Sequence, residues 1–206
     1  MIQAIVEGQG EGAAFPILIR RLLPELGCYV DVGGAPIRSR RSEIVREADF
    51  KRVLQIATFK PNASALFVLF DADDDCARTH VPNMQLWARE VSPQMPCAVV
   101  MARCEYEAWF LAAIESLRGQ RQISMDAMYP LDPEEKRDAK GVIKSFMPPS
   151  APYSPTADQP ALSARFDLKA AYARASSFRK LVKELCRVLE ALGQSPAIPP
   201  DWRGNT

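Results

Sequence analysis

Two uninterrupted apolar runs, "ALFVLF" (residues 65–70) and "CAVVMA" (residues 97–102), limit the folds open to this chain more than any other feature. Short, continuous, β-prone apolar runs are typical of strands buried on both faces, as in a parallel sheet. Each is followed by a segment with helical spacing, and two more such strand-helix pairs precede them. The pattern predicts strands at 2–7, 28–37, 65–70 and 97–102, and helices at 12–26, 49–57, 83–91 and 103–117.

This alternation predicts an α/β fold in which a parallel sheet is covered by helices on both faces and joined by right-handed crossovers. After residue 118 the pattern changes. Residues 132–147 and 167–192 have helical character, the second as a long helix or a helix pair, whereas residues 148–160 contain five prolines and are expected to be a loop. We therefore expect a core over 1–118 and an α-helical C-terminal extension over 119–206 that packs on it.

Acidic residues follow three of the four predicted strands. The carboxyl ends of parallel strands meet at one edge of the sheet, where ligands of open α/β sheets bind. The residues concerned are Glu7 and Glu11 after the first strand, Asp71, Asp73, Asp74 and Asp75 after the third, and Glu105 and Glu107 after the fourth.

Mutual repulsion makes such a cluster costly, because two carboxylates ~5 Å apart repel by roughly 3 kcal/mol at an effective dielectric constant near 20. The cluster must take up protons, spread apart or hold a cation. Hard oxygen ligands without a histidine or cysteine cluster favour Mg²⁺ or Mn²⁺. At each strand taken singly, the acids could instead cap a turn or a helix N-terminus.

A dinucleotide-binding site is a competing prediction. The stretch "GQGEGA" (residues 8–13) fits the fingerprint G-x-G-x-x-A after a strand, and Asp31 follows at the spacing of a ribose-binding acid. Its charge argues against this reading, because Glu7 and Glu11 would flank a pyrophosphate that is already negative.

"VEGQGE" and "FDADDD" resemble motifs of the Toprim domain, the metal-binding module of topoisomerases, bacterial primases and overcoming-lysogenization-defect (OLD) nucleases. A longer set of segments, "READF", "DADDDC", "EYEAWFLAA", "DAKGVIKSFM", "YSPTADQPAL" and "SFRKL", is similar to a bacterial family known as domain of unknown function 4276 and considered Toprim-like. The resemblance implies a three-layer α/β/α, Rossmann-like sheet of about four strands and Mg²⁺-dependent chemistry on phosphodiesters.

The resemblance also assigns site residues. The Toprim glutamate falls on Glu7, the DxD aspartates fall on Asp71 and Asp73, and these three are the candidate catalytic residues. Glu11 matches the second glutamate of the nuclease branch, and either Glu105 or Glu107 matches its further acid; all six are candidate metal ligands. No tyrosine is placed by a topoisomerase-like region, which makes a strand-passing enzyme improbable.

We therefore expect a Mg²⁺- or Mn²⁺-dependent nuclease that acts on DNA or RNA, in bacterial defence or DNA repair, with a separate ATPase as partner. The chain has no GxxxxGK[ST] motif, so ATP hydrolysis would come from another chain. Two alternatives remain open: a non-catalytic module that binds metal or a nucleotide and regulates an ATPase, and the dinucleotide-binding enzyme.

Contacts to substrate phosphates must come from local basic residues, because the net charge is only +1. Candidates are Arg41 in the first basic stretch, Lys140 in "DAKG", and Arg179 in "SSFRKL", where two serines stand at a phosphate-friendly spacing. Each could also lie on a solvated helix face.

The five cysteines form no CxxC motif, the N-terminus has no leader-like segment, and no apolar run approaches the ~20 residues of a membrane span. These features predict a cytoplasmic protein without membrane contact.

Overall fold

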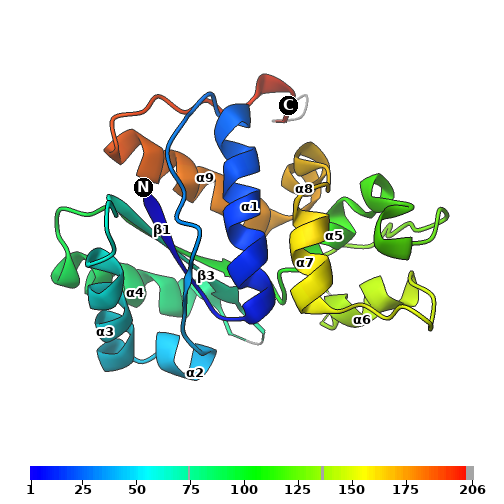
Figure 1. Ribbon diagram of the computed structural model, residues 1–206, viewed down its shortest axis with the longest axis horizontal. Helices are drawn as coiled ribbons and strands as arrows, with labels where there is room; N and C mark the ends of the chain where they lie inside the picture. Colours follow the sequence, from blue (N-terminus) through cyan, green and yellow to red (C-terminus); the bar gives the residue numbers. More distant parts are fainter. Residues whose placement is uncertain (74, 136, 203–206) are drawn as a thin grey trace.

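Four parallel strands form one sheet at the centre of the computed structural model, which describes residues 1–73, 75–135 and 137–202 (Figure 1). The strands are β1 (Ile2–Val6), β2 (Ile37–Arg38), β3 (Ala65–Asp71) and β4 (Cys97–Ala102), in the order β2-β1-β3-β4. All neighbouring pairs are parallel, and β1 lies next to β3. The predicted parallel sheet is confirmed. Asp74, one of the candidate acids, lies outside the described residues.

Helices cover both faces of the sheet, which confirms the three-layer α/β/α architecture. On one face, α1 (Gln9–Glu25) and α9 (Ser176–Ala191) pack against alternate strand residues such as Phe67 and Leu69. On the other face, α3 (Glu47–Thr58) and α4 (Ala77–Val91) pack against the intervening residues, including Val68. The uninterrupted apolar strands follow from this burial on both sides, since neither face of β3 or β4 meets water.

The C-terminal half completes this core. Residues 123–202 supply many members of the apolar cluster that also holds α1, and the Arg21 side chain donates hydrogen bonds of 2.8 Å to the carbonyls of Ser163 and Phe166. Four shorter helices lie beyond the carboxyl ends of the strands, to the right in Figure 1: α5 (Ala108–Ala112), α6 (Ala139–Ser145), α7 (Pro155–Ser163) and α8 (Leu168–Arg174). The remaining short elements are α2 (Arg41–Ile44) and the 3-10 turns at Ile114–Leu117, Gln120–Gln122 and Pro200–Trp202.

The prediction of a second strand over 28–37 is largely wrong. Only Ile37–Arg38 pair with β1, and Val32 makes an isolated bridge to Ile2. Two glycines and Pro36 interrupt the segment between them. Proline cannot donate to a sheet ladder and glycine weakens a strand, so this edge of the sheet stays short.

Several predicted helix boundaries also need correction. The predicted helix over 103–117 is reduced to α5 and the following 3-10 turn, since Cys104 has a positive φ of 62°. The predicted helix over 132–147 begins at 139, after Asp138 caps it from a left-handed conformation. The proline-rich loop contains the start of α7, because Pro155 occupies the first helical turn, where no backbone N–H is needed. Of the two forms predicted for 167–192, a long helix or a helix pair, the structure has the pair, α8 and α9.

Among the described residues, no helix is both long and apolar enough to cross a membrane.

Candidate metal centre at the carboxyl edge of the sheet

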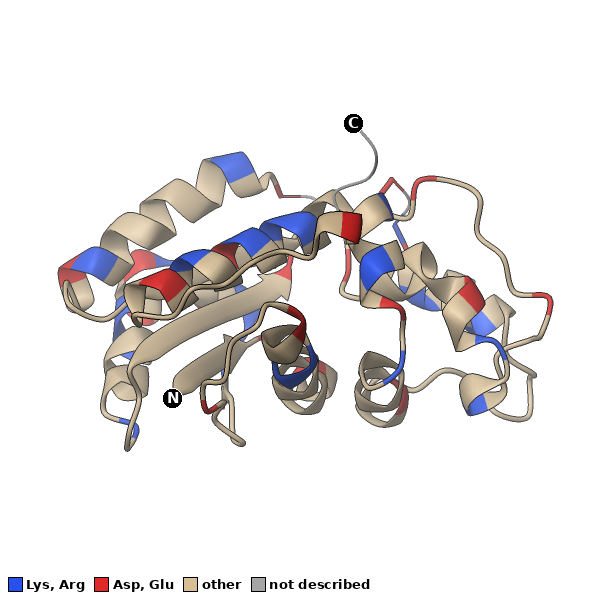
Figure 2. Ribbon diagram, turned by 90° about the horizontal axis from the view of Figure 1, so that it is seen from above, with Lys and Arg blue, Asp and Glu red and all other residues tan. Residues whose placement is uncertain are grey.

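The strand register brings the predicted acids to one edge of the sheet. Val6 lies opposite Leu69, so Glu7 and Asp71 leave neighbouring strands in the same direction. Asp71 lies opposite Ala102, and the loop after β4 therefore carries Glu105 and Glu107 to the same place. In Figure 2, red segments lie where the strand arrows end.

Asp71 is at the centre of this edge, with a side chain that is only 13% exposed. Its Oδ1 accepts a 2.8 Å hydrogen bond from the backbone N–H of Tyr106. Burial, followed by the charges of Glu107 and Glu11, raises the pKa of Asp71 well above its ordinary value, although Lys140 acts in the opposite direction. The negative charge on Asp71 is therefore costly in the absence of a further cation.

Lys140, from the first turn of α6, extends into the acids rather than into solvent. Its Nζ lies 3.6 Å from Asp71 Oδ2, 3.6 Å from Glu105 Oε1 and 3.8 Å from Glu107 Oε2. Burial alone would lower the pKa of Lys140, but the three carboxylates outweigh it and raise the pKa above its ordinary value. Lys140 thus contributes one positive charge against three carboxylates.

Glu107 is completely buried and is held by residues of the proline-rich segment. Its Oε1 accepts hydrogen bonds of 2.9 Å from the Tyr153 hydroxyl and from Gln159 Nε2. Gln159 Nε2 also donates to Glu11 Oε1 at 3.3 Å. Sequence reasoning did not assign roles to Tyr153 and Gln159, although both lie in "YSPTADQPAL", a segment that carried the family resemblance.

Close packing around Glu11 explains why glycine occupies positions 8 and 10 at the start of α1. Glu11 Oε2 accepts a 2.5 Å hydrogen bond from the N–H of Gly8 and so closes the N-terminus of the helix. A Cβ on Gly10 would lie 1.8 Å from Gln159 Oε1 and 2.8 Å from the carbonyl of Pro155. A pyrophosphate bound in the dinucleotide manner requires this N-terminus to be free, and Glu11 and α7 cover it.

Two buried carboxylate oxygens, Glu7 Oε2 and Glu107 Oε2, have no hydrogen-bond partner among the described residues. An unsatisfied buried carboxylate is unfavourable unless a cation or a proton compensates it. Burial and the charges of Glu11 and Asp73 raise the pKa of Glu7, against the lowering effects of Arg41 and the Asp71 backbone. The donor set is all oxygen, which suits Mg²⁺ or Mn²⁺.

These oxygens do not yet surround a common point. No group of three Asp, Glu, His or Cys side chains within residues 1–73, 75–135 and 137–202 is arranged so that it could hold a metal ion as it stands. The candidate ligands are all oxygen donors and therefore fit a divalent cation in their chemistry. Because Lys140 lies where the acids converge, these side chains would have to rearrange around it to bind one.

Asp73 and Arg41 lie at the outer side of the edge. Asp73 is 58% exposed, has a positive φ of 46°, and lies 3.3 Å from Arg41 Nη1. Arg41 also donates to the carbonyl oxygens of Asp71 and Ala72 and to Asp75 Oδ2. Its guanidinium therefore holds the acidic loop in place, and its predicted contact with a substrate phosphate stays a prediction.

Arg179 contacts its own helical hairpin. Its Nη1 donates hydrogen bonds of 2.9 Å to the carbonyls of Tyr172 and Ala173 at the end of α8. The two neighbouring serines do bind an anion, but the anion is the Glu134 carboxylate of the same chain. Ser176 and Ser177 each donate both a backbone N–H and a hydroxyl to it.

Glu107 gives the site a pH dependence that can be measured without metal. Burial raises its pKa to about 7, against the lowering effects of Lys140 and the Tyr153 hydroxyl. Between the unfolded value of 4.5 and about 7, the folded protein holds a proton that the unfolded chain has lost, so the free energy of unfolding falls as pH rises. In EDTA, urea unfolding of wild type and Glu107→Gln should show a smaller fall in the variant across this window. If the free energy of unfolding changed with pH in the same way in both proteins, Glu107 would not be the group that titrates in this window.

The family model described as "Domain of unknown function (DUF4276)" matches residues 6–186. No curated protein and no solved structure is significantly similar to this chain. The match runs from the end of β1 into α9 and so includes every candidate ligand and both residues of the proline-rich segment that contact Glu107. The chain therefore belongs to this family of unknown function.

Proposed function

We propose that this protein is a Mg²⁺- or Mn²⁺-dependent enzyme that cleaves phosphodiester bonds in nucleic acid. The observation that supports this most directly is a pair of buried carboxylate oxygens, Glu7 Oε2 and Glu107 Oε2, that accept no hydrogen bond within the described residues. They lie at an acidic sheet edge where Lys140 faces three carboxylates. The excess of negative charge favours an additional cation. The resemblance of "VEGQGE" and "FDADDD" to Toprim motifs points to the same chemistry.

Glu7, Asp71 and Glu107 would hold the cation. Glu11 and Asp73, whose charges raise the pKa of Glu7, and Glu105, whose Oε1 lies 3.6 Å from Lys140 Nζ, would support them or a second ion. A divalent cation supplies the charge that attracts a phosphodiester and stabilises an in-line displacement by water. In the metal-free protein Glu107 can take up or release a proton near neutral pH, since its pKa is about 7, and a bound cation would favour its carboxylate form. Lys140, once its carboxylates have another partner, can donate hydrogen bonds to a phosphate oxygen.

The position of Lys140 favours one alternative, a non-catalytic module that binds metal or nucleotide and regulates an ATPase. A lysine that remained among the carboxylates would keep a cation from the full set of ligands that cleavage requires, whereas a regulatory role does not require that set. In either case, the resemblance to ATPase-associated nucleases suggests a partner ATPase and a role in defence or DNA repair, and the five cysteines favour a cytoplasmic location.

Cleavage assays on the purified chain test the enzymatic proposal. Incubation with single-stranded and double-stranded DNA and RNA should give cleavage with Mn²⁺ or Mg²⁺ and none with EDTA. Cleavage that continues in EDTA would contradict the proposal. Metal binding without cleavage, also in the presence of a partner ATPase, would favour the regulatory module.

Metal binding should be visible in the melting temperature. Millimolar Mn²⁺ is expected to raise it, because a ligand that binds only the folded state stabilises that state. Asp71→Asn should abolish the rise without lowering the stability of the metal-free protein, because the variant removes a buried charge whose pKa is already raised. Differential scanning fluorimetry of both proteins measures this, and an unchanged wild-type melting curve would count against the metal centre.

A further inference from the structure

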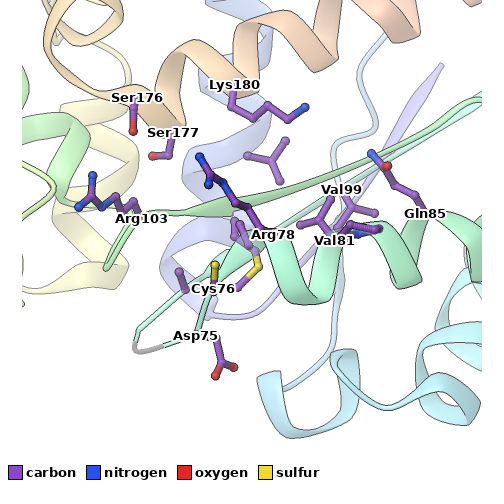
Figure 3. Close-up of a pocket in the computed structure, with 15 residues that line it drawn as sticks. Asp75, Cys76, Arg78, Val81, Gln85, Val99, Arg103, Ser176, Ser177 and Lys180 are labelled. Atoms are coloured by element: carbon purple, nitrogen blue, oxygen red, sulfur yellow. The ribbon is translucent and has the colours of Figure 1, made fainter.

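A groove runs along the free edge of β4, between α4 and α9 (Figure 3). It consists of two adjoining cavities of about 630 and 490 Å³, which share Gln85 on one wall and Lys180 on the other. The larger cavity begins at Asp75 in the acidic loop, and the smaller one continues to Cys97 at the start of β4. The groove therefore leads away from the candidate metal centre.

The floor of the larger cavity is apolar. Ala77, Val81 and Pro82 of α4 supply its accessible apolar surface, whereas Val99 and Met101 of the edge strand line it but are only 0% and 4% exposed. Among the described residues that line the two cavities, none is aromatic. The groove thus offers contact to a flat apolar group without the stacking platforms of dedicated single-strand-binding proteins.

Three exposed arginines line this groove. Arg78 and Arg103 line the larger cavity and Arg89 the smaller one, and all three are exposed. Within the described part of the chain, none of the three side chains makes a hydrogen bond or an ion pair. In contrast, Lys180 and Arg187 on the opposite wall are paired with Glu184, at 2.7 and 2.8 Å.

The direction of Arg78 supports a role in binding. In Figure 3, Arg78 reaches from the α4 side across the groove towards α9. Arg103 stands two residues before Glu105 in the loop after β4, and the neighbouring Cys104 carbonyl accepts a hydrogen bond of 3.0 Å from Asp73 N–H. The backbone that carries Arg103, and with it a positive charge at the mouth of the groove, is therefore held next to the acidic edge.

We propose that the groove binds a single strand of nucleic acid, with phosphates on Arg103, Arg78 and Arg89 and base faces against the apolar floor. This inference rests on the proposed function, since it assigns the groove to the substrate of the same site. A duplex fits less well, because its base faces are covered by stacking and its outer surface offers phosphates. A second copy of the chain would bring these unpaired arginines against one another.

Binding is measured without metal, so that it does not depend on cleavage. A fluorescein-labelled oligothymidine of about twelve nucleotides is titrated with the protein in EDTA at several salt concentrations, and anisotropy is recorded. Wild type should bind the single strand more tightly than the matching duplex. Arg78→Ala and Arg103→Ala should each weaken binding several-fold and reduce the slope of log K against log salt by about 0.7, the value for one phosphate contact.

Arg165→Ala is the matched control, because Arg165 is also exposed and lies at the end of α7, outside the two cavities. It should leave affinity and slope unchanged. Gln85→Glu and Gln85→Lys provide a second test at the midpoint of the groove, where the first should weaken and the second strengthen binding.

Three results would overturn the groove assignment: equal losses in Arg165→Ala and Arg103→Ala, equal affinity for duplex, or stronger binding of poly-glutamate than of the oligonucleotide. The last would identify the occupant as an acidic polypeptide. Normal binding without cleavage under any metal condition would leave the groove in place and contradict only the proposed enzymatic function.

Discussion

Asp71→Asn and Glu7→Gln should each reduce metal-dependent cleavage by about 100-fold or more. Groups that only orient metal ligands already contribute up to about 100-fold, and each of these substitutions removes a charge from the proposed ligand set itself. Asp71 is the stronger test, because asparagine can still accept the 2.8 Å hydrogen bond from Tyr106 N–H that fixes the side chain. Cleavage rates with Mn²⁺, measured on folded protein, give the result.

The matched control is Asp167→Asn. Asp167 caps α8 by accepting a 3.0 Å hydrogen bond from Ala170 N–H, and asparagine is an equally good N-cap. The same change of aspartate to asparagine, made in the helical extension, should leave the cleavage rate unchanged. Full activity in both Glu7→Gln and Asp71→Asn would show that the carboxylate edge is not the active site.

Glu134→Ala should lower the free energy of unfolding by about 3 kcal/mol, since each buried donor left unpaired costs about 1–3 kcal/mol and a charge near a helix N-terminus adds to this. Glu134 is 1% exposed and accepts four hydrogen bonds at the start of α9. Its removal leaves the N–H groups of Ser176 and Ser177 unpaired. Urea unfolding of wild type and variant measures the change in the free energy of unfolding, with one slope of free energy against urea concentration fitted to both proteins.

Glu135→Ala is the control for this prediction. The neighbouring glutamate is exposed, and its removal should change stability by no more than about 0.5 kcal/mol. Sulfate should restore part of the stability that Glu134→Ala loses, because the anion can bind the vacated N-terminus of α9. It should not stabilise wild type in this way, because Glu134 occupies that N-terminus. A Glu134→Ala protein as stable as wild type would show that the four hydrogen bonds contribute little.

The sequence alone determined the sheet and the direction of its strands. Residues 65–70 and 97–102 could be assigned because strands buried on both faces must be apolar at every position, a local requirement visible in a few consecutive residues. The position of Glu7 and Asp71 at one edge followed from the same argument, since parallel strands end on the same side. The prediction of a second strand over 28–37 was wrong because Gly33, Gly34 and Pro36 interrupt the segment, although its apolar residues are of the kind that form strands.

The tertiary structure decided which groups complete the site. Lys140 was a candidate from the sequence, but only the fold shows that it lies among the acids. Tyr153 and Gln159 reach their acidic partners from segments that are 46 to 148 residues distant, so no local pattern could reveal them. The serines of "SSFRKL" did indicate an anion, but only the fold shows that Glu134 supplies it, from 42 residues away. Local propensity is set by neighbouring residues, whereas the charge balance of a buried site depends on which distant side chains share it.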